Sequence, residues 1–363
     1  MILMDRRDIV IKTIRGEETE YTPYHFDLTM KITDRLGEHY GLDRDEVEDF
    51  IGNHFLYLSF GGPDGAGSGY RDNAGGMNTA GDEACRGTGK GEIFRDEFGV
   101  AWDASGNYDI GDWGLVDNAV KGLDFSGYTF PDGKGEGRFG KAVETMEKYP
   151  GRLNVMMVKG PFVQGWEITG MDDFLVGMIA EESKIKWVLE NTTNYIVNII
   201  EAIPEGVDAV RVLDDWGMQS GLLFSKEMWK KFMYPRLMEI GDAIRKRGML
   251  FMHHSCGDTA ELFPYFVDLG IDVYDPMQPE ALDIAYVKRQ FGKDVTLFGG
   301  LGSQSTIPMG SPADVVKEAR ETHALLGEGG MYVLGPAGSV PTEAPIENVV
   351  ALVDYCKGYA GSG

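Results

Sequence analysis

The chain has 363 residues, of which 43% are hydrophobic and 25% are charged. This composition excludes a disordered protein and is sufficient for a large buried core. The 58 acidic and 34 basic residues give a formal net charge of −24, and a field of that sign repels nucleic-acid phosphates and anionic lipid surfaces, so neither is expected as a partner.

Eight short apolar runs are predicted to form β-strands: residues 22–27, 54–60, 154–160, 208–215, 249–257, 271–276, 295–302 and 331–338. Longer amphipathic stretches between the later runs predict helices, such as residues 226–248 and residues 311–330, the second with Ser311 as its N-cap and Pro312 in its first turn. Strands that alternate with helices imply a parallel sheet with right-handed crossovers. We therefore expect an α/β fold, a (β/α)8 TIM barrel, with an open doubly wound sheet as the alternative.

Residues 61–150 interrupt this alternation. Residues 61–81 are rich in glycine, and residues 92–105 have the pattern of a strand or hairpin. We interpret the segment as an insertion after the second strand. In a barrel it would leave from the C-terminal face, where it can act as a lid. The whole chain, residues 1–363, is expected to form a single barrel domain that carries this insertion.

The sequence also predicts a cellular compartment. Cys85, Cys256 and Cys356 are odd in number and far apart, which argues against a disulfide framework. The first residues lack the apolar run and cleavage site of a signal peptide, and no run of 18 apolar residues predicts a transmembrane helix. We therefore expect a cytoplasmic protein without a membrane partner.

The most informative motif is HHSCG, residues 253–257, at the end of a predicted strand. Alternate residues of a strand share a face, so His254 and Cys256 point to the same side. A nitrogen and a sulfur ligand at the C-terminal end of a barrel strand suit zinc, which in catalytic sites takes about three protein ligands and keeps an open position. The alternative is a buried cysteine beside a hydrogen-bonded histidine.

Other polar clusters follow neighbouring strands. Asp214 and Asp215 end one strand, and because adjacent strand residues face opposite ways, one of them is expected to enter the barrel mouth as an acid or an outer partner of a metal ligand. Asp275 ends the strand after the His–Cys strand, so it is the nearest further oxygen ligand, although a turn-forming role before Pro276 competes with this interpretation. Gln278 and Glu280 are second choices. Further candidates are Glu167 as a catalytic residue and Trp166, Trp216, His253 and Gln278 as substrate contacts.

These residues resemble the uroporphyrinogen decarboxylase superfamily along nearly the whole chain. The resemblance rests on DDWG (214–217), HSCG (254–257), DPMQPE (275–280), FGGLGSQ (298–304) and the stretch from residue 335 to residue 356. It implies the same barrel fold that the strand pattern predicts.

The superfamily includes two chemistries. Its metal-free decarboxylases grip substrate carboxylates with a cationic N-terminal motif close to MRQAGRY, and residues 22–36 contain no such motif. Its corrinoid-linked methyltransferases place an HxC pair on zinc and often add a later cysteine. His254 and Cys256 match that pair, but Ala337 stands near the position of the later cysteine, so the resemblance leaves Asp275 or Glu280 as the substitute.

We therefore expect a zinc-dependent methyltransferase that moves a methyl group between a small methyl ether, amine or thioether and a corrinoid (cobalamin). The corrinoid would belong to a partner protein docked at the barrel mouth, because the chain has no DxHxxG cobalamin-binding motif. The alternatives are a metal-free decarboxylase of the uroporphyrinogen type and a non-catalytic barrel that binds a corrinoid or a partner protein. The sequence is also compatible with a homodimer.

Overall fold

The structure is a computed structural model that describes residues 4–62, 93–103, 114–135 and 137–361. It is an α/β fold built on a seven-stranded parallel sheet in the order β1-β5-β6-β9-β10-β11-β12. Each strand overlaps one of the predicted runs. Their bounds are Phe55–Leu58 (β1), Leu153–Lys159 (β5), Ala209–Leu213 (β6), Leu250–His254 (β9), Val273–Met277 (β10), Thr296–Leu301 (β11) and Tyr332–Pro336 (β12).

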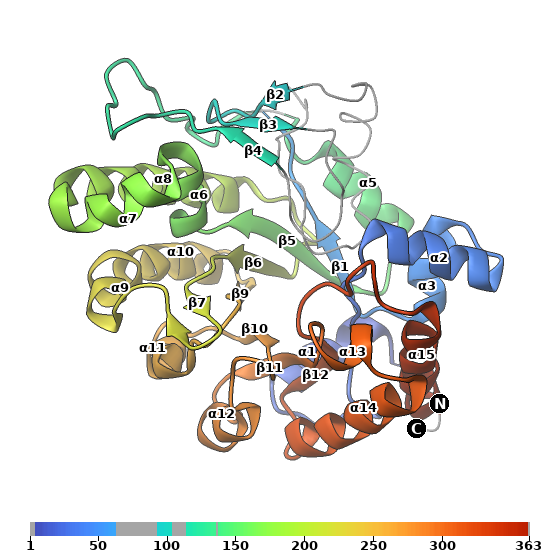
Figure 1. Cartoon of the computed structure of the whole chain (residues 1–363). Helices are drawn as coiled ribbons and strands as arrows, with labels where there is room; N and C mark the ends of the chain where they lie inside the picture. The colour runs from blue at the N-terminus through green and yellow to red at the C-terminus, as the bar shows by residue number, and fades with distance from the viewer. Residues whose placement is uncertain (1–3, 63–92, 104–113, 136, 362–363) are drawn as a thin grey trace.

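Helices that connect these strands cover the outer side of the sheet (Figure 1). The predicted helix at 311–330 is confirmed as α14, where Ser311 caps the first turn and Pro312 follows it. The predicted helix at 226–248 is two helices, because Pro235 fits only the first turn of α10. The connecting helices are α5 (Gly140–Lys148), α6 (Pro161–Thr169), α7 (Met171–Ala180), α8 (Glu182–Ala202), α9 (Lys226–Phe232), α10 (Tyr234–Lys246), α11 (Phe263–Asp268), α12 (Ile284–Phe291), α13 (Thr306–Met309) and α14 (Pro312–Gly327), and α15 (Ile346–Ala360) follows the last strand.

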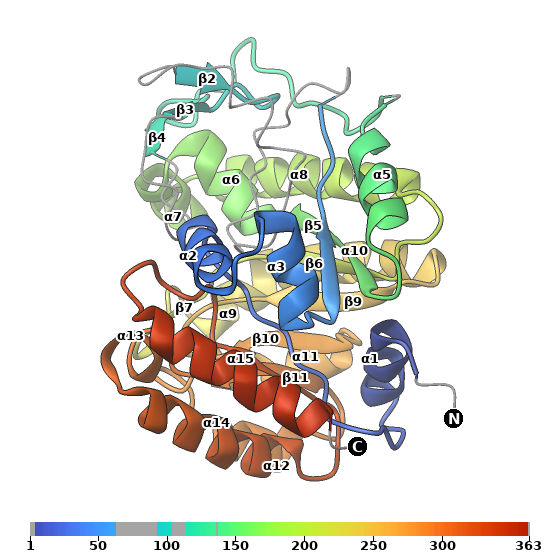
Figure 2. The same cartoon turned by 90° about the vertical axis from the view of Figure 1, so that its right-hand side faces the viewer.

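Two hydrophobic clusters lie on the two faces of the sheet. The larger cluster packs the outer face against the helices. The smaller one fills the inner face with alternate strand residues, such as Val155, Met252 and Val333. Val10 and Ile14 of α1 (Arg6–Ile14) join this inner cluster, and the amide of Arg7 donates to the carbonyl of Gly151 just before β5. The helix α1 therefore covers the amino ends of the strands (Figure 2).

The run predicted as the first strand, residues 22–27, is not a regular strand in the structure. Tyr24 makes an isolated parallel bridge to Leu334 of β12, and Leu28, the residue after the run, makes another to Val340, beyond the end of β12. On its other side the side chain of Asn53 replaces a strand partner, since it accepts from the amide of Phe26 at 2.8 Å and donates to the carbonyl of Phe26 at 3.1 Å. This segment is followed by α2 (Met30–Tyr40) and α3 (Arg44–Ile51), which lead into β1.

The predicted insertion lies between β1 and β5. Most of its glycine-rich part falls outside the described residues, as does Cys85. Its described part contains a small antiparallel sheet of β2 (Ile93–Arg95), β3 (Ala101–Asp103) and β4 (Gly114–Asp117). The indole of Trp102 in β3 lies 4.8 Å from Nζ of Lys159, the last residue of β5, so this small sheet covers the carboxyl end of β5. Among the described helices, none combines the length and the apolar character needed to cross a membrane.

Candidate metal centre

Three side chains that can bind a metal meet at the carboxyl ends of β6 and β9. Nε2 of His254 lies 3.4 Å from Sγ of Cys256 and 3.7 Å from Oδ1 of Asp215. The ligand atoms of these three residues all lie within 4.8 Å of one another. In a tetrahedral zinc site, nitrogen, sulfur and oxygen ligands lie about 3.4–3.6 Å apart. The donor set and the two distances from Nε2 of His254 therefore fit zinc.

The candidate centre faces solvent on one side. The side chain of His254 is 16% exposed and that of Asp215 is 56% exposed. A zinc ion that binds substrate needs a free coordination position, which a fully enclosed site does not offer. The three residues would leave such a position on the open side.

Asp275, which the sequence suggested as the third ligand, lies behind the imidazole instead. Nδ1 of His254 is 2.6 Å from Oδ1 of Asp275, whereas Nε2 faces Cys256 and Asp215. Nε of Arg211 donates to Oδ2 of Asp275 at 3.0 Å, and its Nη2 contacts Oδ1. Burial raises the pKa of Asp275, but the positive charges of Arg211 and His254 outweigh burial and lower it to about 2. The carboxylate therefore orients His254, in the way that outer partners orient metal-bound histidines.

The charges around His254 also change its own proton affinity. Burial lowers the pKa of the imidazole, but the neighbouring Cys256 and Asp275 raise it more strongly, so the pKa lies well above the usual value of histidine. The negative charges of Cys256 and Asp275 beside one imidazole stabilise positive charge at this place, whether a proton or a metal ion supplies it.

Two glycines allow the loops that carry Asp215 and Cys256 to touch. A Cβ on Gly217 would lie 2.4 Å from the carbonyl oxygen of Cys256, and one on Gly257, whose φ is +81°, would lie 2.3 Å from the carbonyl carbon of Gly217. The amide of Cys256 donates to Oδ1 of Asp215 at 2.9 Å. The glycines of the DDWG and HSCG motifs are thus required for the centre to assemble.

We expect Gly217→Ala to displace Cys256 and to lower the zinc content of the purified protein several-fold. The added methyl group must push two backbones apart, and overpacking of this kind costs about 1–3 kcal/mol of stability. Metal analysis and thermal unfolding measure the two effects. Gly140→Ala is the matched control, because a Cβ on Gly140 meets nothing within 4 Å. Full zinc content in Gly217→Ala would contradict the tight contact.

Asp214, suggested from the sequence as a catalytic acid, does not reach the candidate centre. Its side chain is fully buried and accepts from the amide of Val163 at 2.8 Å and from that of Phe162 at 3.4 Å, at the amino end of α6. A Cβ on Gly160 would lie 2.2 Å from Cγ of Asp214. Burial raises the pKa of Asp214 well above its usual range. This residue caps a helix, and Asp215 is the one that reaches the candidate centre.

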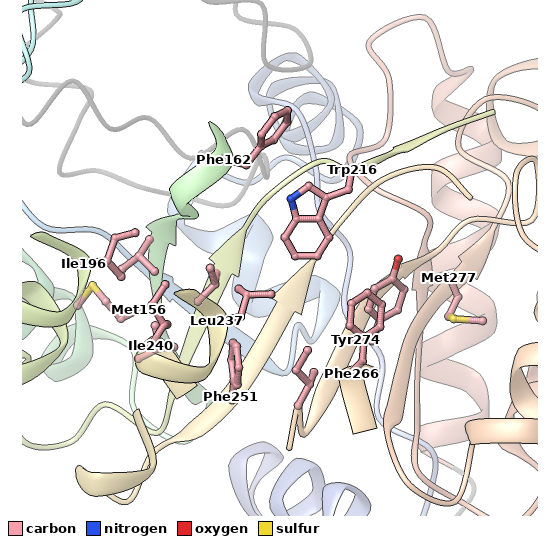
Figure 3. Packing of buried hydrophobic residues seen from close by; sticks show 14 of the residues in the cluster. Met156, Phe162, Ile196, Trp216, Leu237, Ile240, Phe251, Phe266, Tyr274 and Met277 are labelled. Carbon is pink, nitrogen blue, oxygen red and sulfur yellow. The ribbon is translucent and has the colours of Figure 1, made fainter. Parts of the chain in front are cut away.

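Trp216 and His253, suggested as substrate contacts, are both fully buried on the outer side of β9. Their rings stack at a centroid distance of 4.6 Å, and both rings lie near that of Phe266. Figure 3 shows Trp216 and Phe266 among the buried hydrophobic residues. Burial lowers the pKa of His253 to about 3, so this imidazole is neutral. The two residues therefore pack behind the strand that carries His254.

The remaining candidates, Gln278, Trp166 and Glu167, have partners other than the three residues of the candidate centre. Gln278 is buried, and its Oε1 accepts from the amide of Gly257 at 3.0 Å. Trp166 is partly buried and packs on the outer hydrophobic cluster. Glu167 is buried and accepts from Nζ of Lys159 at 2.6 Å. Burial raises the pKa of Glu167, although Lys159 counteracts it.

Lys159 and Arg211 were not predicted from the sequence. Arg211 places a positive charge inside the apolar strand AVRVL, and Lys159 places one at the end of the apolar strand LNVMMVK. Both occupy positions that share the inner face with Val155 and Ala209. A basic residue in an otherwise apolar buried strand is the signal that would have identified them.

Comparison with known proteins identifies the family. The family model described as uroporphyrinogen decarboxylase (URO-D) matches residues 134–359. This chain belongs to the uroporphyrinogen decarboxylase family. The resemblance inferred from the sequence motifs is thereby confirmed.

Within this family, the chain is similar to proteins of both chemistries. It is 26% identical over 215 residues to the methylated-thiol–coenzyme M methyltransferase of Methanosarcina mazei, which covers 59% of this chain and 56% of that protein. It is 25% identical over 197 residues to the methylcobamide:CoM methyltransferase MtaA of Methanosarcina barkeri, covering 54% of this chain and 55% of that protein. It is 27% identical over 165 residues to the uroporphyrinogen decarboxylase of an Anaeromyxobacter species, covering 46% and 45%. The chain spans about half the length of these curated relatives.

A solved structure supports the fold. A methyltransferase from Methanosarcina mazei superposes with a TM-score of 0.69, covering 98% of this chain and 99% of that chain. The sequences are 18% identical, so this similarity concerns the fold alone.

Proposed function

We propose that this uroporphyrinogen decarboxylase-family protein is a zinc-dependent methyltransferase that moves a methyl group between a small methylated molecule and the corrinoid of a separate protein. The observation that carries the proposal is the grouping of Asp215, His254 and Cys256 at one end of the parallel sheet. Relatives named methylcobamide:CoM methyltransferases support the corrinoid as one partner of the exchange. The small molecule would be a methyl ether, amine or thioether.

The proposal includes a single closed eight-stranded barrel. Residues 24–28 would take the eighth position between β12 and β1, which their bridges to Leu334 and Val340 and their contacts with Asn53 support. All the polar groups discussed above would then surround one mouth, where the corrinoid protein would dock.

In this site Asp215, His254 and Cys256 would hold the metal, and Asp275 would keep Nε2 of His254 turned towards it. Zinc, when bound there, supplies Lewis-acid polarisation of the heteroatom that carries the methyl group. Glu167 is the buried acid whose raised pKa suits proton donation to the departing heteroatom. Lys159 would hold Glu167 in place through its 2.6 Å hydrogen bond.

The proposal is tested by incubating the protein with reduced cobalamin and a panel of methoxylated aromatics, methylamines and methyl thioethers. Formation of methylcobalamin, followed by absorbance, is the expected result with at least one class. The reverse reaction is assayed with methylcobalamin and the corresponding demethylated acceptors. Methyl transfer in neither direction by zinc-loaded protein would contradict the proposed activity.

A decarboxylase remains the second candidate because relatives of that name match the chain. Such an enzyme must neutralise several substrate carboxylates. Among the described residues, however, Arg35 donates to the carbonyls of Thr342 and Ala344, and Arg211 is paired with Asp275. The exposed Arg95 donates to the carbonyl of Gly99. This use of the described arginines favours the methyltransferase.

A further inference from the structure

A line of buried polar side chains leads away from the candidate metal centre across the inner face of the sheet. Asp275 contacts His254 on one side and Arg211 on the other. Nη2 of Arg211 lies 3.6 Å from Oδ2 of Asp27, and Oδ1 of Asp27 lies 3.1 Å from Nε2 of His25. The line therefore joins β10 and β6 to the N-terminal segment 24–28.

Arg211 is the central member of this line. Its side chain is 1% exposed, as is that of Asp275, and the side chain of Asp27 is 4% exposed. The ring of Tyr57 lies 5.0 Å from its guanidinium carbon. Burial of the Arg211 and Asp275 charges is costly because both lose their hydration, and the ion pair offsets this cost only when its geometry is good. Apolar residues of the same volume often stabilise a core better than a buried ion pair does. Stability alone therefore does not explain a guanidinium at this position.

The geometry around Nδ1 of His254 indicates another role. Oδ1 of Asp275 lies 2.6 Å from this nitrogen and is nearer to it than Nη2 of Arg211, which lies 3.0 Å away and can only donate, so the carboxylate is the partner that accepts the Nδ1–H. Arg211 has no acceptor atom, and it directs N–H groups at both oxygens of Asp275. The carboxylate is thereby held in one plane with Oδ1 turned to His254. When Asp275 accepts the Nδ1–H of the neutral ring, the lone pair of Nε2 is left on the side of Cys256 and Asp215.

We propose that Arg211 is a positioning residue for the metal centre, which fixes the orientation and tautomer of His254 through Asp275 and is itself anchored by Asp27. This inference rests on the proposed zinc site. The planar guanidinium fork is essential to it, because a lysine ammonium at the same place can supply charge but cannot hold both carboxylate oxygens in one plane.

The first test measures zinc affinity by competition with a chromophoric chelator. Arg211→Met removes the fork and keeps a long side chain, and we expect zinc to bind about 10- to 100-fold more weakly, the range typical for loss of the outer partners of a metal ligand. Arg211→Lys should fall between this variant and the wild type. Arg152→Met is the matched control, since Arg152 is also buried and paired, with Asp49, at the amino end of β5. We expect its zinc affinity to stay within about twofold of the wild type.

The second test measures which nitrogen of the His254 imidazole carries a proton and which one binds the metal. Nitrogen-15 NMR of histidine-labelled, zinc-loaded protein should show Nδ1–H and metal-bound Nε2 for His254 in the wild type. In Arg211→Met this pattern should give way to a mixture of states, and in Arg152→Met it should persist. A merely structural role of Arg211 would leave the pattern unchanged.

The outcomes separate the two proposals. If the wild-type protein binds no zinc, the proposed function and this inference both fail. If the wild type binds zinc and folded Arg211→Met keeps the same affinity and NMR pattern, only the inference is overturned. Should Arg211→Met fail to fold, Arg211→Lys decides: a loss of about fivefold or more in zinc affinity supports the positioning role, and unchanged affinity overturns it.

Discussion

Cys256→Ser is expected to abolish stoichiometric zinc binding in a protein that otherwise binds about one zinc per chain. The thiolate is the strongest zinc ligand of the three residues that converge, and a serine hydroxyl at the same place is a poor substitute. His254→Ala should have the same effect, because Nε2 lies between Cys256 and Asp215. We expect each variant to lose affinity more than about 100-fold, beyond the range seen for outer partners of a ligand.

Metal analysis after exhaustive dialysis, together with chelator competition, measures this loss. The matched control is Cys356→Ala, which removes a thiol that is fully buried in α15. This control should retain zinc even if it lowers the melting temperature. Full zinc occupancy in Cys256→Ser would exclude Cys256 as a ligand and with it the proposed centre.

The same assay ranks the two carboxylates. We expect Asp215→Asn to weaken zinc binding more than Asp275→Asn, because Asp215 offers an oxygen to the proposed ion, whereas Asp275 acts through the ring of His254. An amide can still accept the Nδ1–H of His254, so part of its orienting role survives in Asp275→Asn. The opposite ranking would restore Asp275 as the third ligand.

Most of the fold can be predicted from the pattern of apolar runs in the sequence. Alternating apolar runs and amphipathic stretches predicted the parallel α/β sheet, since buried parallel strands are continuously hydrophobic. Residues 22–27 were predicted as a strand but do not form a regular one. The side chain of Asn53 takes the backbone hydrogen bonds of Phe26, and the hydrophobic pattern of the sequence does not reveal this. The glycine-rich stretch predicted a break in the pattern, and the strand or hairpin expected at residues 92–105 is confirmed by the pairing of β2 with β3. The third strand of this small sheet, β4, has no such signal in the sequence.

The residues of the candidate site could be predicted from the sequence where they all lie in one secondary-structure element. His254 and Cys256 follow from alternation in a single strand and the turn after it. The roles of Asp214 and Asp215 depend on another element, because Gly160 at the start of α6 leaves room for one carboxylate to cap that helix. Asp275 was placed correctly beside His254, but sequence cannot tell which side of the imidazole it contacts.

The second large effect concerns the choice between the two chemistries of the family. We expect the zinc-loaded wild type to methylate cob(I)alamin from a suitable donor and to leave porphyrinogens unchanged. We expect Cys256→Ser to lose methyl transfer by a factor of about 10²–10³, the range that removal of a single electrostatic partner of the reacting group commonly costs. Anaerobic assays with uroporphyrinogen and with the methylated panel measure both activities on the same preparations.

The expected failure on porphyrinogens has a structural reason. A polycarboxylate substrate needs positive charges that are free to meet it, whereas the protein carries a net charge of −24. At the carboxyl end of β5, Lys159 is already bonded to Glu167, and in the middle of β6 Arg211 is bonded to Asp275. Cys356→Ala again serves as the control and should retain methyl transfer. Porphyrinogen turnover by the wild type that persists undiminished in Cys256→Ser would mean that the converging donors are not the reactive centre, because a metal-free decarboxylation has no use for the thiolate.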